Sequence, residues 1–286
     1  MTIAVGAKYP WGELKRLLPP DTSIPEAIIL ASDSRFSRRL PSGPFFPSSN
    51  SGTKLFELGR DVAAVYAGIS KISELCLDEL RWKLSKQKNP NSTKSRKLAQ
   101  DTLKTTYRHH IALERLRPDE APLYILIGTC NKLGKAELYQ FSHNNEFSPL
   151  PTTGLKAIGY PETTNTFYQL IQDELHKEVE KQLNLRHKYP QVPLEHLDPM
   201  PIKAEHIAIL ISAALSRIIE SGSDRTIGGK IQCAVITSKG IVLPEISYST
   251  DPTNKGPGWT RVTTKPEELV TVTGISGTFG LYSLSN

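Results

Sequence analysis

The chain has 286 residues with 38% hydrophobic content, enough to bury a sizeable core in one large domain or two small ones. Its 35 Lys and Arg residues against 29 Asp and Glu residues give a net charge of +6, which is too small an excess to indicate a nucleic-acid-binding protein. The three cysteines lie far apart in apolar runs, so they indicate reduced core residues and imply neither a disulfide framework nor a zinc site.

Two short apolar runs near the amino terminus predict β-strands at residues 2–8 and 27–33. The connection between them, residues 9–26, contains several prolines and a Trp-Gly pair, so we expect a long inserted loop with one helical turn at most. Residues 36–52 are rich in serine, proline and glycine, and this composition predicts a mobile, exposed loop.

A hairpin and two helices are predicted next along the chain. The hairpin joins strands at residues 54–58 and 62–67 through a Gly-Arg-Asp turn. Residues 70–86 place their apolar side chains on one helical stripe. A polar linker that contains Pro90 separates this helix from a second one at residues 98–116.

The second half of the chain repeats this order of strands followed by helices. We expect a strand pair at 123–128 and 136–141, a short strand ending at 157–159, helices at 162–183 and 204–220, and a hairpin at 230–236 and 240–243. The tail is rich in glycine, threonine and proline. It either adds strands at 268–273 and 280–284 or forms an extension that packs on a neighbouring subunit.

The order of the elements predicts the fold class. Consecutive strands with hairpin-length turns favour antiparallel sheets over a doubly wound parallel sheet. Strand pairs that alternate with helix pairs predict two such sheets with helices on their outer faces. We therefore expect an α/β fold of the α+β type, a four-layer αββα sandwich at residues 2–248, followed by a C-terminal extension at 249–286.

The residue behind the initiator methionine is Thr2, and so small a residue permits removal of Met1. The mature chain would then carry a hydroxyl nucleophile and a free α-amine on one residue. A hydroxyl attacks poorly until a base takes its proton, and an α-amine with a pKa of about 8 is such a base near neutral pH. Many proteins begin Met-Thr, so the meaning of Thr2 depends on the residues downstream.

Six short motifs follow Thr2 in a definite order. They are AIILASDSR at 27–35, TKLF at 53–56, VYAG at 65–68, YILIG at 124–128, AIG at 157–159 and DRTIGG at 224–229. In this order the chain resembles the β-type subunits of proteasomes, which belong to the N-terminal-nucleophile hydrolases, and it would be a bacterial proteasome-like homologue. The resemblance spans residues 2–244, without the insert at 9–26 and without the tail.

The resemblance implies that Thr2 attacks the scissile carbonyl, and that Asp33 and Lys54 match the aspartate and lysine of the family. A lysine ammonium beside the nucleophile favours loss of the hydroxyl proton and keeps the α-amine neutral by repulsion. The carboxylate holds and stabilises that ammonium. Taken singly, Asp33 is typical of a turn at a strand end and Lys54 of a solvated surface; the ordered set favours the catalytic interpretation.

The same resemblance gives roles to four further residues. Gly68 matches the glycine whose N–H donates into the family's oxyanion hole, and a glycine lets the backbone approach a substrate closely. Alternatively, Gly68 is an ordinary glycine in the turn between a strand and a helix. Tyr66 and Ser70 flank Gly68 and would shape the pocket for the residue before the cut. Asp224 matches a supporting acid of the catalytic set.

Two departures from the family pattern bear on activity. Tyr160 stands where the family has a serine that positions the terminal amine, and Ile227 stands where the family has a hydroxyl residue before two glycines. The hydroxyls of Thr163, Thr164 and Thr226 are available to compensate. These departures leave open an inactive member of the family.

The sequence therefore predicts a threonine-type endopeptidase that cleaves polypeptide substrates through an acyl-enzyme ester, with no metal or other cofactor. The resemblance implies a homo-oligomer, either a ring or a helical stack, and identifies no ATPase partner. Two alternatives stay open: an inactive proteasome-like scaffold subunit, and an amidohydrolase of the same class acting on a small amide. No signal peptide or long apolar run is visible, so we expect a cytoplasmic protein with no membrane or nucleic-acid partner.

Overall fold

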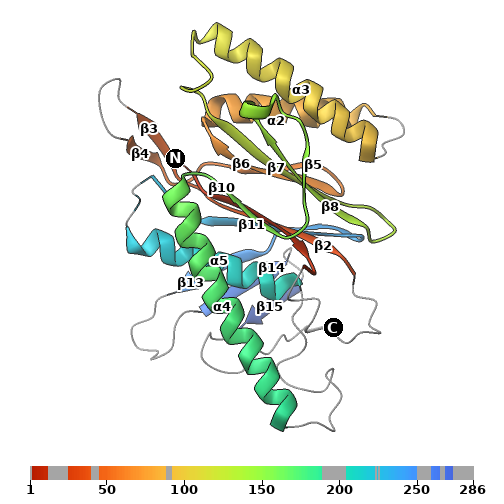
Figure 1. Cartoon of the computed structure of the whole chain (residues 1–286), viewed down its shortest axis with the longest axis vertical. Helices are drawn as coiled ribbons and strands as arrows, with labels where there is room; N and C mark the ends of the chain where they lie inside the picture. Colours follow the sequence, from red (N-terminus) through yellow and green to blue (C-terminus); the bar gives the residue numbers. More distant parts are fainter. Residues whose placement is uncertain are drawn as a thin grey trace.

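The computed structural model describes residues 2–11, 25–39, 45–87, 92–188, 204–222, 224, 226–249, 259–264 and 268–272. Two five-stranded antiparallel sheets lie face to face, and a pair of helices covers the outer face of each (Figure 1). This arrangement confirms the predicted α+β sandwich. No helix in the described part of the chain combines the length and the apolar character needed to cross a bilayer.

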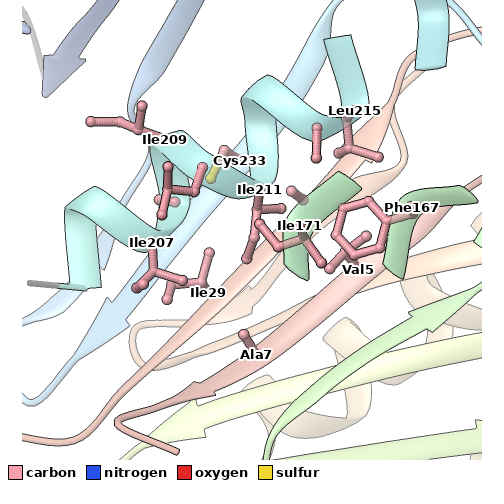
Figure 2. Packing of buried hydrophobic residues seen from close by; sticks show 14 of the residues in the cluster. Val5, Ala7, Ile29, Phe167, Ile171, Ile207, Ile209, Ile211, Leu215 and Cys233 are labelled. Atoms are coloured by element: carbon pink, nitrogen blue, oxygen red, sulfur yellow. The ribbon is translucent and has the colours of Figure 1, made fainter. Parts of the chain in front are cut away.

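The first sheet contains the amino-terminal strand. Across the sheet its strands are β10 (Leu155–Ile158), β1 (Ala4–Tyr9), β2 (Ala27–Asp33), β11 (Ile231–Thr237) and β12 (Gly240–Val242). Helices α4 (Pro161–Lys188) and α5 (Ala204–Ser221) cover it. Figure 2 shows Phe167 of α4 beside Val5, and Ile207 of α5 beside Ile29. Every residue of β2 is buried, because this strand has a sheet neighbour on each side and a packed layer on each face.

The second sheet carries the other helix pair. Its strands are β5 (Leu55–Gly59), β6 (Val62–Gly68), β7 (Leu123–Cys130), β8 (Ala136–Ser142) and β9 (Leu150–Thr152). Helices α2 (Ser70–Ser85) and α3 (Ser92–Leu113) cover its outer face. Leu77, Leu80 and Leu103 are fully buried in this layer, so the predicted apolar stripes are the faces that meet the sheet.

The two sheets share an inner core of small and branched side chains. Along β6, Val65 and Ala67 face the other sheet, whereas Ala64 and Tyr66 face the helices, as the two-residue period of a strand requires. Ile28 and Leu30 of β2 meet them from the opposite sheet. The same strands therefore hold residues in two separate packing layers, which decides what each side chain can touch.

The strand, helix and hairpin predictions agree with the structure except at a few places. Residues 36–52 were expected to form a mobile, exposed loop; in the structure, β3 (Phe36–Arg39) and β4 (Phe45–Ser49) pair as a separate two-stranded sheet. Ladder hydrogen bonds override the weak strand preference of serine and proline here. Helix α3 also begins earlier than expected, at Ser92, inside the predicted linker.

A three-stranded sheet crosses the predicted domain boundary at residue 248. It consists of β13 (Glu245–Ser249), β14 (Trp259–Thr264) and β15 (Glu268–Val272). The boundary falls inside β13, so the fold continues past it, while β15 lies where a strand was predicted. Most of the insert at 9–26 and the predicted strand at 280–284 lie outside the described residues.

We predict that Gly128 of β7 limits how closely the two sheets approach. A Cβ at this position would lie 2.4 Å from Cγ2 of Ile28, so Gly128→Ala should destabilise the fold by about 1–3 kcal/mol. Gly59→Ala is the matched control, because a Cβ at that strand glycine meets nothing within 4 Å. Urea unfolding measures both; equal free energies of unfolding for the two variants would contradict the prediction.

Candidate active site

Asp33 is the centre of a buried hydrogen-bond cluster at the end of β2. Its Oδ1 accepts the backbone N–H of Ile3 at 3.3 Å and the Nζ of Lys54 at 3.0 Å. Its Oδ2 accepts the backbone N–H groups of Arg35 and Gly228 at 3.2 and 3.1 Å. Donors from three separate stretches of chain therefore converge on one carboxylate that has no exposed surface.

Lys54 is the cation of this cluster, and it is as deeply buried as its partner. It directly precedes β5 of the second sheet, and only 1% of its side chain is exposed. Its Nζ also donates to the backbone carbonyl of Arg35 and lies 5.8 Å from the centroid of the Phe36 ring. The ion pair therefore ties the end of β2 in one sheet to the start of β5 in the other.

Burial shifts both members of the pair toward their neutral forms. It raises the pKa of the Asp33 carboxyl and lowers the pKa of the Lys54 ammonium, while their mutual attraction and hydrogen bond act in the opposite direction. Lys54 therefore releases its proton more readily than an exposed lysine.

Thr2 lies next to this pair. It directly precedes Ile3, whose N–H reaches Asp33, and only 5% of it is exposed. On the other side, Gly159 has a φ of +145°, and a Cβ there would lie 2.4 Å from the carbonyl oxygen of Thr2. Glycine is required at this close approach. The backbone of Thr2 is thus held between the ends of β2 and β10.

The loop that contains Gly228 closes over Asp33, and Arg35 fixes it there. The Nη1 of Arg35 donates to the carbonyl of Ile227 at 2.9 Å, and its Nε donates to Oδ1 of Asn50 at 2.7 Å. A Cβ at Gly228 would lie 2.2 Å from the guanidinium carbon, so the Arg35 side chain lies directly against this glycine. The role of Arg35 escaped prediction, although it belongs to the same DSR motif as Asp33.

Gln232 of β11 is a second residue that the sequence did not indicate. Its Oε1 accepts the backbone N–H groups of Lys54 and Leu55 at 2.8 and 3.0 Å, and its Nε2 donates to the carbonyl of Gly52 at 2.7 Å. One amide thus holds the segment that carries Lys54 against the first sheet. No short motif marks this role, because the partners are 178 and 180 residues away along the chain.

Asp224 forms its own polar cluster with two of the threonines that were singled out. Its Oδ1 accepts the backbone N–H and the hydroxyl of Thr226 at 2.8 and 2.5 Å, and its Oδ2 accepts the hydroxyl of Thr163 at 3.0 Å. Burial raises the pKa of Asp224, but these hydrogen bonds outweigh it, so the pKa lies below its usual range. Asp224 is therefore an anion near neutral pH. It precedes Gly228, a donor to Asp33, by four residues in the chain.

Gly68 and Ser70 lie where β6 passes into α2. Gly68 has a φ of +144°, and a Cβ there would lie 2.1 Å from the carbonyl oxygen of Pro122. Local geometry alone therefore requires glycine at this position. Ser70 is half-buried and is the first residue of α2. These contacts neither require nor oppose a role in binding an oxyanion.

Tyr66 was expected to line a substrate pocket, and that expectation is wrong. Its side chain is fully buried between the second sheet and the helices, because it has the helix-facing parity of β6. Its hydroxyl donates to the carbonyl of Thr53 or to Oε1 of Glu74, each at 3.4 Å. Tyr66 therefore supports the residue before Lys54 from inside the core.

The two departures from the family pattern have different surroundings. Ile227 is buried in the core between the first sheet and its helices, so an apolar residue suits this position and its backbone carbonyl serves Arg35. Tyr160 is 42% exposed, and its backbone carbonyl accepts the N–H of Thr164.

No family model matches this chain, and no curated protein matches it.

We predict that Lys54→Met destabilises the fold by about 3–5 kcal/mol near neutral pH, because it leaves the buried Asp33 carboxylate without its cation. The pKa of Asp33 then rises further above its value in the unfolded chain, so the folded variant holds an extra proton. The free energy of unfolding of the variant should fall as the pH rises from the pKa of Asp33 in the unfolded chain to its pKa in the folded variant. The loss of stability relative to the wild type should therefore be larger at about pH 8 than at about pH 5.

Chemical denaturation at both pH values measures the effect. Lys71→Met is the matched control, because Lys71 pairs with Glu114 on the surface with 70% of its side chain exposed, and an exposed pair contributes at most about 1 kcal/mol. A deficit for Lys54→Met no larger than that of Lys71→Met, or one that shrinks as the pH rises, would contradict the prediction.

Proposed function

We propose that the protein is a threonine-type peptidase of the N-terminal-nucleophile class, with Thr2 as its nucleophile after removal of Met1. One observation carries the proposal. Oδ1 of Asp33 accepts both the N–H of Ile3 and the ammonium of Lys54, so the residue that precedes Ile3 lies beside a buried lysine. A free amine, a hydroxyl and a buried ammonium at one point form the set that such chemistry requires.

In the proposed mechanism, the α-amine of Thr2 takes the proton of its own hydroxyl. The positive charge of Lys54 favours the alkoxide and keeps the amine neutral, and Asp33 holds Lys54 in place. The threonine oxygen attacks the peptide carbonyl, the C–N bond breaks, and the leaving amine takes the proton that the α-amine had accepted, which gives an ester between substrate and enzyme. Water then hydrolyses the ester and restores the hydroxyl. The N–H of Gly68 is proposed to donate to the oxyanion.

The Asp224 cluster supports activity despite the two missing hydroxyls. The hydroxyls of Thr163 and Thr226 both donate to Asp224, so this carboxylate is fixed and ionised. We propose that it stabilises the terminal amine in its protonated state during the reaction. Thr163 and Thr226 would thus replace the two hydroxyl residues that the family has where this chain has Tyr160 and Ile227.

The resemblance to proteasome β-type subunits suggests the wider setting. Polypeptides are the proposed substrates, and the proposed assembly is a ring or helical stack of identical chains that encloses the sites. A cytoplasmic location fits a chain with three cysteines that are all free and buried.

One observation favours the second candidate, an inactive scaffold of the same fold. Tyr160 is 42% exposed, and its backbone carbonyl accepts a hydrogen bond from the following helix. The position where the family has a serine that orients the terminal amine therefore lacks a hydroxyl close to the backbone. A scaffold would keep the Asp33–Lys54 pair because that pair joins the two sheets.

We predict that Thr2→Ala lowers turnover of fluorogenic peptide amides at least about a thousandfold, since removing a nucleophile leaves only binding and oxyanion effects. Thr2→Ser should retain measurable turnover, because it keeps both hydroxyl and amine. Thr164→Ala is the control: its hydroxyl donates to the carbonyl of Pro161 and lies outside the proposed catalytic set. Intact mass must first verify that Met1 is absent from each variant.

The outcomes separate the candidates. Wild-type turnover that survives Thr2→Ala would refute the nucleophile. A correctly processed chain that cleaves no amide of any size would favour the scaffold. Cleavage of small amides without cleavage of peptides would favour the amidohydrolase.

A further inference from the structure

A cavity of about 440 Å³ lies between helices α2 and α3 and the outer face of the second sheet. Val62, at the start of β6, lines it, whereas Gly68 ends that strand on the side of Thr2. A strand of this length spans about 20 Å, so the cavity is separate from the candidate active site. Its volume falls in the range of about 300–1,000 Å³ that is typical of small-molecule sites.

The floor of the cavity is apolar. Its apolar lining comes from α2, α3 and the sheet, through Leu80, Leu84, Ala99, Ile127 and Phe141. Ala99 has the smallest of these side chains, and it leaves room where the two helices lie over the strands. The apolar part of a ligand would therefore find a matching surface.

Two cations line the cavity, and both are already engaged by neighbouring residues. Nη1 of Arg96 donates to the hydroxyl of Tyr139 at 2.6 Å, and its guanidinium carbon lies 4.9 Å from the centroid of that ring. The Nζ of Lys135 lies 3.3 Å from Oε1 of Glu137. An incoming anion would have to compete with these partners.

The lining also contains a carboxylate with one oxygen that lacks a hydrogen-bond donor. Oε2 of Glu137 is buried, and no donor among the described residues meets full hydrogen-bond geometry with it, although the Tyr139 hydroxyl and the Lys135 ammonium both interact with the same carboxylate. A buried carboxylate oxygen without a donor carries a desolvation cost that a donor would relieve. Asp61 supplies a second carboxylate to the same lining.

We propose that this cavity binds a small, largely apolar molecule that carries a protonated amine. The ammonium donates to Oε2 of Glu137, and the apolar body lies on Leu80, Leu84 and Phe141. The site is independent of Thr2 and of the proposed peptidase activity. It adds a ligand-binding function to the helix side of the second sheet.

Hexylamine is a suitable probe, and hexanoate is its counterpart of the same length and opposite charge. We expect isothermal titration of the full chain to show saturable binding of hexylamine, weakened about tenfold or more by Glu137→Gln, because a hydrogen bond to a charged group is lost. Glu162→Gln is the matched control, since Glu162 is exposed on α4 across the sandwich. Thr2→Ala should bind hexylamine like the wild type.

Ala99→Phe should abolish binding by filling the apolar part of the cavity. Should that variant fail to fold, Glu137→Gln decides alone, because it preserves the shape of the side chain. No binding of hexylamine, equal binding of hexanoate, or unchanged binding in Glu137→Gln would each overturn the proposal. Failure of peptide cleavage would leave it untouched, so the two proposals fail separately.

Discussion

The arrangement of the candidate site depends on one interaction, the buried ion pair of Asp33 and Lys54. Neither charge is tolerable in the core without the other, since an isolated buried ion costs several kcal/mol. Because Asp33 ends β2 and Lys54 precedes β5, the pair also fixes how the two sheets meet at this edge. The hydrogen bonds from Ile3, Arg35 and Gly228 then place three chain segments around it.

Close backbone approaches complete the site. Glycine is needed at Gly159 because the backbone carbonyl of Thr2 occupies the space of a side chain, and the Arg35 guanidinium lies in the corresponding space at Gly228. Gln232 of β11 accepts the backbone N–H of Lys54, and Asp33 accepts its Nζ, so hydrogen bonds position both the backbone and the charged end of the lysine. Such rigid support is what a catalytic group needs to stay within productive geometry.

Periodicity predicted the layers well, because long apolar runs with a two-residue or helical period leave few alternatives. Asp33 and Lys54 were singled out through the resemblance of their motifs, and the structure brings the two side chains together. Tyr66 was misplaced because strand parity, which decides whether a side chain meets a substrate or a helix, depends on which face each layer covers. Gln232 and the cavity beside Glu137 depend on residues far apart in the chain, which no local pattern reveals.

The most direct measurement is the intact mass of the chain after incubation with a peptide epoxyketone. This reagent forms its cyclic adduct only with a residue that carries both a hydroxyl and a free amine. We expect a stoichiometric mass increase that peptide mapping assigns to Thr2, and its loss in Lys54→Met refolded at a pH where that variant is stable. A chain that lacks Met1, is folded and acquires no adduct would contradict the assignment of Thr2 as the nucleophile.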